Sequence, residues 1–148
     1  MSQFEIREIE KNDLEGLLKL YTQLKDNPVP EIDERVIKVW EDIHRDPNHH
    51  IFVGVIDGII VATCVLIIVS NLTRGQRPYG LVENVVTDAA YRKKGYATKV
   101  LNFAKGMAQQ QNCYKIMLMT GSKKDSTLKF YEQAGYNRQD KTAFIQWL

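Results

Sequence analysis

The sequence has little cysteine and no long apolar run, and each scarcity argues against a class of protein. Two cysteines among 148 residues, Cys64 and Cys113, show no CxxC spacing, which argues against a disulfide framework, a redox motif or a zinc site. Reduced thiols are typical of a cytoplasmic protein. The longest apolar stretch, residues 59–69, is too short to span a bilayer, so we expect no membrane partner. The first residues do not combine a basic stretch with an apolar core, as a secretory signal would.

Neither sign of charge is in large excess. Twenty Lys and Arg residues stand against eighteen Asp and Glu residues, which gives a net charge of +2 at pH 7. Nucleic-acid-binding domains are usually far more basic, so we expect no nucleic-acid partner. The three histidines, His44, His49 and His50, have no carboxylate or cysteine at ligand spacing, and we therefore expect no metal.

The hydrophobic pattern predicts one α/β domain over residues 1–148. A chain that is 44% hydrophobic and 26% charged has the composition of a soluble globular domain, and its length suffices for a core without disulfides. Alternating apolar residues predict strands, with a hairpin turn at Asp57-Gly58, and a 3.6-residue period predicts helices. The expected order is strand 4–9, helix 14–24, helix 33–43, strands 51–56 and 59–69, strand 81–87, helix 96–111, strand 115–119, helix 127–134 and strand 143–147.

A short basic turn that contains glycine joins strand 81–87 to helix 96–111. It ends with Arg92-Lys93-Lys94-Gly95, directly before the helix. A helix N-terminus offers free backbone N–H groups and the positive end of the helix dipole, which together bind anions. Gly95 permits close approach to the backbone, and the three cations add charge. The turn predicts a site for the pyrophosphate of a nucleotide-linked coenzyme, although a solvated helix start has the same composition.

The sequence around this turn resembles that of a known family. Residues 82–97, VENVVTDAAYRKKGYA, are similar to the acetyl-CoA-binding motif of the GNAT superfamily. The pattern is Gln or Arg, two residues, Gly, one residue, then Gly or Ala, which here are Arg92, Gly95 and Ala97. Residues 130–136, FYEQAGY, resemble the FYEKLGF-like helix that follows in the same superfamily. The resemblance implies an acetyl-CoA-dependent N-acetyltransferase of the α/β class, with a mixed, mostly antiparallel sheet of about six to seven strands and about four flanking helices.

The resemblance also implies which residues bind the coenzyme. The sheet would splay open near the end of strand 81–87, so that the backbone of Val85, Val86 and Thr87 lies along the pantetheine arm. Many members carry an Asn about a turn before the tyrosine of the second motif, and this chain does not. Ser126 is therefore a candidate either for a coenzyme contact or for a helix cap. The implied pyrophosphate residues are Arg92, Lys93, Lys94, Gly95, Tyr96, Ala97 and Thr98.

Two side chains are candidates for acid–base chemistry. Glu83 is a charged residue within an otherwise apolar strand, at a position where members that resemble this chain carry a base, acting directly or through water. A glutamate on the solvent side of a strand would fit the pattern equally well. Tyr131 corresponds to the tyrosine that protonates the coenzyme thiolate in many relatives; the alternative is an aromatic ring packed beside Phe130.

The resemblance makes the acceptor an amine and leaves its class open. The loop at residues 71–80 carries Arg74, Arg77 and Tyr79; arginine grips phosphate or carboxylate, although solvated loops also collect it. Residues 113–115 are similar to aminosugar-phosphate and aminoalkylphosphonate acetyltransferases, which implies a small, anionic or phosphorylated metabolite whose primary amine attacks directly in a ternary complex. The alternatives are a protein or peptide N-acetyltransferase and a non-catalytic acyl-CoA-binding sensor. A homodimer is the commonest soluble oligomer and occurs widely in the superfamily.

Overall fold

The order of strands and helices follows the pattern of the sequence. The computed structural model describes residues 3–24 and 27–148. Within them the strands are β1 (Glu5–Glu8), β2 (His49–Ile56), β3 (Ile59–Val69), β4 (Tyr79–Thr87) and β5 (Ile116–Leu118). The helices are α1 (Leu14–Tyr21), α2 (Glu34–Arg45), α3 (Tyr96–Gln110) and α4 (Asp125–Gln133). Short 3-10 turns lie at Lys11–Asp13, Arg74–Gln76 and Ala89–Tyr91.

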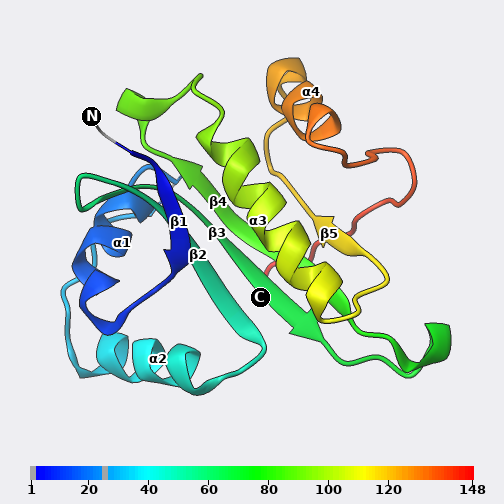
Figure 1. Cartoon of the computed structure of the whole chain (residues 1–148), viewed down its shortest axis with the longest axis horizontal. Coiled ribbons are helices and arrows are strands. Elements are labelled where there is room, and N and C mark those ends of the chain that lie inside the picture. Colours follow the sequence, from blue (N-terminus) through cyan, green and yellow to red (C-terminus); the bar gives the residue numbers. More distant parts are fainter. Residues whose placement is uncertain (1–2, 25–26) are drawn as a thin grey trace.

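The strands form one sheet in the order β1-β2-β3-β4-β5, so that neighbours in the sheet are also neighbours in the sequence (Figure 1). β1 to β4 pair antiparallel, and β5 joins β4 in parallel. A parallel pair needs a crossover connection, and α3 provides it between β4 and β5. The hairpin between β2 and β3 turns at Asp57 and Gly58, whose φ angles are 49° and 77°. Two consecutive positive φ angles fit a type I′ turn, as the Asp-Gly pair predicts.

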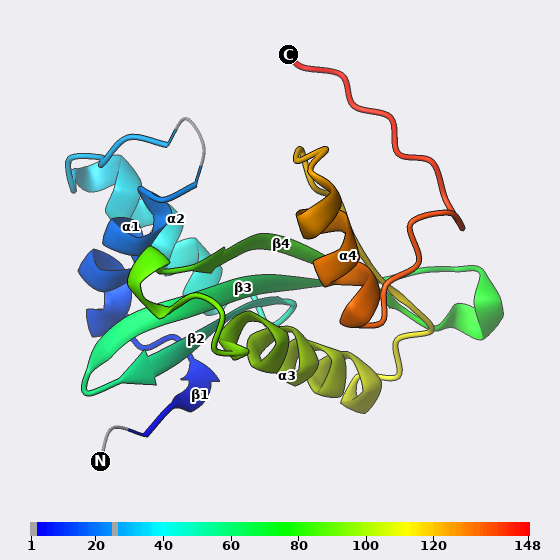
Figure 2. The same cartoon turned by 90° about the horizontal axis from the view of Figure 1, so that it is seen from above.

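Helices pack on both faces of the sheet and build a separate core on each (Figure 2). Apolar side chains on one stripe of a helix must be buried against another element, and here each stripe meets one face of the sheet. The core under α3 contains Phe52, Ala62, Cys64, Leu66, Ile68, Val82, Val100, Leu101, Ala104 and Ala108. The core under α1 and α2 contains Leu17, Leu20, Trp40, Ile51, Val53, Ile60, Val65 and Val86.

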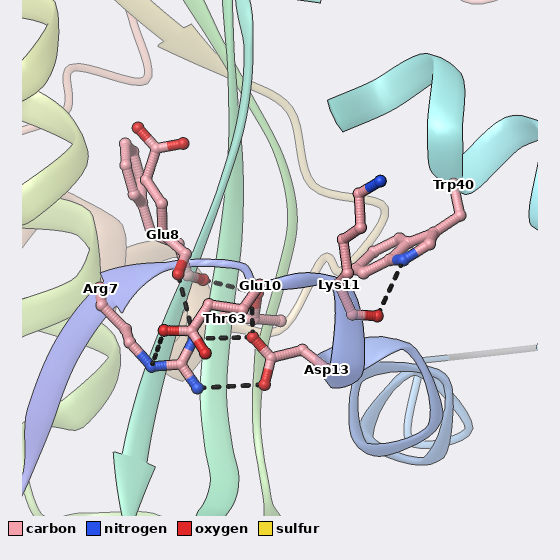
Figure 3. Close-up of polar contacts among 8 residues, drawn as sticks. Arg7, Glu8, Glu10, Lys11, Asp13, Trp40 and Thr63 are labelled. Atoms are coloured by element: carbon pink, nitrogen blue, oxygen red, sulfur yellow. Dashed lines mark hydrogen bonds and ion pairs between the residues drawn. The ribbon is translucent and has the colours of Figure 1, made fainter. Parts of the chain in front are cut away.

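A partly buried ion pair ties β1 to the start of α1 (Figure 3). Arg7 donates from Nη1 and Nη2 to the two carboxylate oxygens of Asp13, at 2.6 and 3.0 Å. Asp13 also accepts the backbone N–H of Glu10 at 2.7 Å. The hydrogen bond from Arg7 is the main cause that holds the pKa of Asp13 below its ordinary value of 3.8. Trp40 Nε1 donates to the carbonyl of Lys11 at 3.2 Å, so α2 is fastened to the same junction.

The predicted mixed sheet with four helices is confirmed, but the predicted strand at residues 143–147 is wrong. The described sheet has five strands rather than six or seven, and residues 141–148 are extended and exposed along their whole length. The β-branched and aromatic composition of this segment suits a strand, yet a strand needs a neighbour with which to exchange hydrogen bonds. No such neighbour reaches it within the described part of the chain.

The sequence predicts no membrane-spanning segment, and the helices of the structure bear on this expectation. Across residues 3–24 and 27–148, no helix has both the length and the apolar character required to cross a bilayer.

Candidate functional site

β4 and β5 pair over three residues only and then separate. Gly80, Leu81 and Val82 pair with Ile116, Met117 and Leu118. β4 continues to Thr87, but in the described sheet its residues 83–87 have a paired strand only on the side of β3. In the same stretch β4 has a bulge on its β3 side, opposite Cys64, where the register shifts and Asn84 has a φ of 50°.

The edge of β4 that is left open is the edge along which the coenzyme is expected from the sequence. Peptide groups on an unpaired strand edge are available for hydrogen bonds with another extended chain, which is how a pantetheine arm would bind. Val85 is half-buried and Val86 is buried. The hydroxyl of Thr87 is buried and has no hydrogen-bond partner within residues 3–24 and 27–148, so a polar group is left for a ligand to satisfy. The roles of these three residues stay a prediction.

The turn that follows β4 leads into an open helix N-terminus. Gly95 is the N-cap of α3, with a φ of 81°, and no side chain in the described part of the chain caps this end. A Cβ placed on Gly95 would meet no atom within 4 Å, so the space beside its backbone is open. The N–H groups of the first turn have no partner inside a helix, and here they belong to Tyr96, Ala97 and Thr98. The turn therefore offers backbone donors at the positive end of a helix dipole.

Cations surround this open helix end. Arg92, Lys93 and Lys94 are exposed, and Lys93 has a φ of 64°, which turns the backbone sharply before the helix. Arg92 Nε donates to the carbonyl of Thr87 at 3.2 Å, so the side chain fastens the turn to the end of β4. Its planar guanidinium keeps further N–H donors for an anion. Chemically the donor set suits a diphosphate, as the sequence predicts.

Two of the predicted coenzyme residues have other contacts. The ring of Tyr96 stacks on Phe4 with the centroids 4.2 Å apart, so one face of the ring is covered by packing. Ser126 is exposed in the first turn of α4, where Lys124 is the N-cap and no side-chain cap is formed. The cap alternative for Ser126 is therefore not what the structure shows, and its coenzyme contact stays a prediction.

Glu83 lines a cavity of about 540 Å³ between the sheet and helices α1 and α2. Its side chain is half-buried, and most of the cavity wall is apolar. The polar side chains of the wall are Tyr21, Arg35, His49, Glu83 and Asn84. The apolar side chains are Leu14, Leu17, Leu18, Val36, Val39, Trp40, Ile43, Ile51, Val65 and Ile67.

Among the polar side chains of this cavity, Tyr21 has a buried hydroxyl group. This hydroxyl makes no hydrogen bond of good geometry with the residues that the structure describes, although the Asn84 side chain is its nearest polar neighbour. Burial raises the pKa of Tyr21 to about 12, an effect that the nearby Asn84 side chain partly offsets. The phenol is therefore neutral at physiological pH and can donate a hydrogen bond to a bound molecule. A carboxylate, a phenol and an amide thus line one small, mostly apolar cavity. Such a cavity suits a small ligand whose polar groups form hydrogen bonds at one end.

Tyr131 lies on α4 and packs against the core under α3. Its ring makes edge contacts with Phe130 and Tyr136, at centroid distances of 5.1 and 6.3 Å. Burial, and to a smaller extent Cys64, raises the pKa of Tyr131 above 10. A phenol that stays protonated at physiological pH is suited to giving a proton to a departing thiolate. The packing alternative is equally visible, so the acid role stays a prediction.

The loop before β4 does not share the cavity of Glu83. Arg77 donates to the carbonyls of Asn112 and Cys113, at 3.1 Å each, and so fastens the loop to the approach to β5. Arg74 lies over the ring of Tyr114 at 5.7 Å, and Tyr79 contacts the same ring edge-on. Six residues of extended chain separate positions 77 and 83, a path of about 20 Å. The structure places Arg74, Arg77 and Tyr79 together, but apart from Glu83.

Sequence reasoning missed four polar residues of the cavity. Tyr21 has the spacing of the apolar stripe of α1 and therefore looked like a core residue. Arg35 and His49 belong to segments without a recognisable motif, and burial is the main cause that lowers the pKa of His49. Asn84 carried a signal that could have been used, because asparagine inside an apolar strand often marks a bulge with positive φ.

The described residues include no cluster of three or more His, Cys, Asp and Glu side chains that could hold a metal ion. The expectation of metal-free chemistry therefore stays a prediction.

Comparisons with known proteins agree on one family. The sequence profile of the acetyltransferase (GNAT) family matches residues 14–136. A glucosamine 6-phosphate N-acetyltransferase of Trypanosoma brucei brucei is 29% identical over 139 residues, which cover 93% of this chain and 91% of that protein. Among solved structures, a protein of Agrobacterium tumefaciens str. C58 assigned as an acetyltransferase is 40% identical, with a TM-score of 0.92 over 97% of this chain and 99% of the other. A glucosamine-6-phosphate N-acetyltransferase from Arabidopsis thaliana is 26% identical, with a TM-score of 0.86 over 99% and 98%.

Proposed function

The chain belongs to the GNAT family of acetyltransferases, and we propose that it moves the acetyl group of acetyl-CoA to the primary amine of a small, anionic or phosphorylated metabolite. The amine attacks directly while both substrates are bound. One observation carries the proposal: the open edge of β4 leads, through the turn at residues 92–95, into the uncapped N-terminus of α3. A strand edge followed by an anion site suits a coenzyme that is an extended chain ending in a diphosphate.

The donor supplies an activated acetyl thioester, and the chain supplies orientation and proton transfer. Backbone groups of Val85 and Thr87 hold the pantetheine arm along β4, and the turn holds the diphosphate. Glu83 accepts the proton of the acceptor ammonium, directly or through one water, because an amine must be neutral to attack. The Tyr131 hydroxyl donates a proton to the departing sulfur. Holding both substrates in fixed positions lowers the entropic part of the barrier.

The cavity under α1 and α2 is the proposed acceptor site. It contains Glu83 at one side and Tyr21, Asn84 and Arg35 as further polar groups. Arg35 is the cation of the wall, and it is exposed, as a side chain at the entrance would be. Arginine binds phosphate and carboxylate in a two-pronged geometry, so Arg35 suits the anionic group of the acceptor. Relatives named as glucosamine 6-phosphate N-acetyltransferases support an acceptor of this class.

The test is release of free thiol from acetyl-CoA in the presence of a panel of amines. The panel contains aminosugar phosphates, aminoalkylphosphonates, amino acids, polyamines, aminoglycosides and basic peptides. We expect turnover with phosphorylated amines and little with peptides. Turnover with peptides alone would replace this proposal with protein acetylation. Binding of acetyl-CoA, seen as a higher melting temperature, without thiol release from any amine would favour a sensor.

We also propose that the protein works in the cytoplasm. Cys64 and Cys113 are free thiols, and burial raises the pKa of Cys64 to about 12, so that it is a poor nucleophile. Free thiols suit the reducing cytoplasm, where acetyl-CoA is made available to metabolism.

A further inference from the structure

The floor of the proposed acceptor cavity is one row of side chains that runs across three strands. Ile51 on β2 pairs with Val65 on β3, and Val65 pairs with Glu83 on β4. All three side chains line the cavity, and Ile51 and Val65 are buried. Neighbouring strands lie about 4.8 Å apart, so the two apolar residues extend the floor by about 10 Å from Glu83. The carboxylate of Glu83 is therefore the polar end of an otherwise apolar row.

Helices α1 and α2 cover this floor from the same side of the sheet (Figure 2). Four apolar side chains of α2 line the cavity: Val36, Val39, Trp40 and Ile43. They follow the spacing of three and four residues that places side chains on one face of a helix. Trp40 Nε1 already donates to the carbonyl of Lys11, so the ring offers only carbon atoms to the cavity. Val39 is 53% exposed, and an apolar side chain therefore also lies where the cavity meets solvent.

Most polar groups of the cavity lie at its β4 side. Glu83 and Asn84 are consecutive residues of β4, and the Asn84 side chain lies beside the hydroxyl of Tyr21. In the described part of the chain, the remaining polar side chains of the wall are Arg35 and His49. A hydroxylated sugar ring needs hydrogen-bond partners around its whole perimeter, because each hydroxyl gives up water when it enters the cavity. An amine on an apolar body needs such partners only at its two ends.

We propose that the acceptor carries its primary amine on a hydrocarbon body, an alkyl chain or an aryl ring without hydroxyl groups, and that Val36 and Val39 select for this body. The inference rests on the proposed function, because it takes this cavity to be the acceptor site. The amine lies at Glu83, the body lies between the apolar floor and α2, and the anionic group pairs with Arg35. Burial of the body contributes in proportion to the apolar area that it removes from water.

A matched pair of acceptors tests the body directly. Phosphotyramine and glucosamine 6-phosphate each combine a primary amine, a phosphate monoester and a six-membered ring, but only the sugar ring is hydroxylated. We expect kcat/KM for phosphotyramine to exceed that for glucosamine 6-phosphate about tenfold or more, since several hydroxyls must lose water. Equal values, or a preference for the sugar, would overturn the inference and would leave the proposed acetyltransferase function intact.

Polar replacements on α2 test the residues that select the body. Threonine has nearly the shape of valine and a similar helix propensity, so the double variant Val36→Thr with Val39→Thr should fold normally. We expect its KM for phosphotyramine to rise about tenfold and its KM for glucosamine 6-phosphate to stay the same or fall. Val29→Thr is the matched control, because Val29 is 72% exposed and lies outside the cavity wall. A KM that rises equally for both acceptors in the double variant would overturn the selecting role of the two valines.

Binding measured without turnover separates this inference from the proposed function. Calorimetry in the presence of coenzyme A, which has no acetyl group to transfer, gives the Kd of each acceptor. We expect phosphotyramine to bind about tenfold more tightly than glucosamine 6-phosphate. If this preference is found but no amine releases thiol from acetyl-CoA, the proposed function fails while the preference of the cavity for an apolar body stands. If neither acceptor binds, or if the sugar binds as tightly, the inference fails.

Discussion

Val82 on β4 pairs with Leu118 on β5 in the last rung of the parallel ladder, and the next residue along β4 is Glu83. From there β4 keeps β3 as its partner but has no paired residue on β5. Glu83 lines the cavity under α1 and α2, and the open edge of residues 83–87 runs on to the turn before α3. The point at which the two strands part is therefore where the proposed acceptor cavity meets the proposed coenzyme strand.

Replacing Glu83 by glutamine tests the proposed base. Glu83→Gln should lower kcat by about a hundredfold or more, because the amide cannot accept the proton of the acceptor ammonium. The melting-temperature increase caused by acetyl-CoA should be unchanged, since the coenzyme strand is left intact. Glu15→Gln, on the exposed side of α1, is the matched control and should turn over like the wild type. Equal turnover of the two variants would remove Glu83 from the chemistry.

Two glycines with nearly equal positive φ angles allow a paired test of the anion site. Gly95 has a φ of 81° and Gly58 a φ of 77°, and a Cβ would meet no atom within 4 Å at either. Alanine at each position should therefore cost similar stability, about 1 kcal/mol, through the strained φ angle. Only Gly95→Ala places a methyl group where a diphosphate would approach the backbone. We expect its Kd for acetyl-CoA to rise about tenfold by calorimetry, while Gly58→Ala binds like the wild type.

Most of the order of strands, helices and turns could be predicted from the sequence, because it depends on short local sequence patterns. Asp57-Gly58 predicted the hairpin turn, and the glycine of Arg92 to Gly95 predicted the turn that begins α3, whereas the anion site itself stays a prediction. The cavity around Glu83 could not be predicted, since its walls come from α1, α2 and β2 to β4, and contacts across such distances leave no local pattern. The strand expected at residues 143–147 failed for a related reason: its composition shows a preference for strand but not which edge, if any, is available.

Arg35 and Arg77 offer alternative positions for the cation that binds the acceptor. Arg35 lines the cavity that contains Glu83. Arg77, by contrast, already donates from Nε and Nη2 to the carbonyls of Asn112 and Cys113. Arg35→Ala should raise the KM for a phosphorylated amine about tenfold. The KM for an amine that carries no phosphate or carboxylate should be unchanged. The double variant Arg74→Ala with Arg77→Ala should keep the acceptor KM. The opposite result, a higher KM only in the double variant, would return the acceptor site to the loop before β4.

The ion pair between Arg7 and Asp13 should make stability depend on pH in a defined direction. Because Arg7 lowers the pKa of Asp13 in the folded state, the pair stabilises the fold above the unfolded-state pKa, near 3.8, and its contribution is lost as pH falls below it. At pH 7, Asp13→Asn should lower the free energy of unfolding by about 1.5–3 kcal/mol, since Asp13 is buried and its charge-assisted bonds are removed. Urea unfolding at pH 7 and at pH 3 should show this difference shrinking at the lower pH. A difference that stays constant between the two would show that the charge of Asp13 is not what stabilises the junction.

Tyr131 makes the sharpest distinction between catalysis and packing. Phenylalanine keeps the ring contacts with Phe130 and Tyr136, so Tyr131→Phe should leave the melting temperature nearly unchanged. If the hydroxyl protonates the departing sulfur, kcat should fall about 10- to 100-fold at neutral pH. Because the pKa of Tyr131 is raised above 10, the wild type should lose activity only as pH rises through that higher value, and the variant should lack this alkaline decline. Tyr114→Phe is the control for losing a phenol elsewhere, because Tyr114 lies just before β5, where its ring contacts Tyr79 at the start of β4. A Tyr131→Phe enzyme whose turnover equals that of the wild type from pH 6 to pH 11 would mean that the hydroxyl plays no part in the proton transfer.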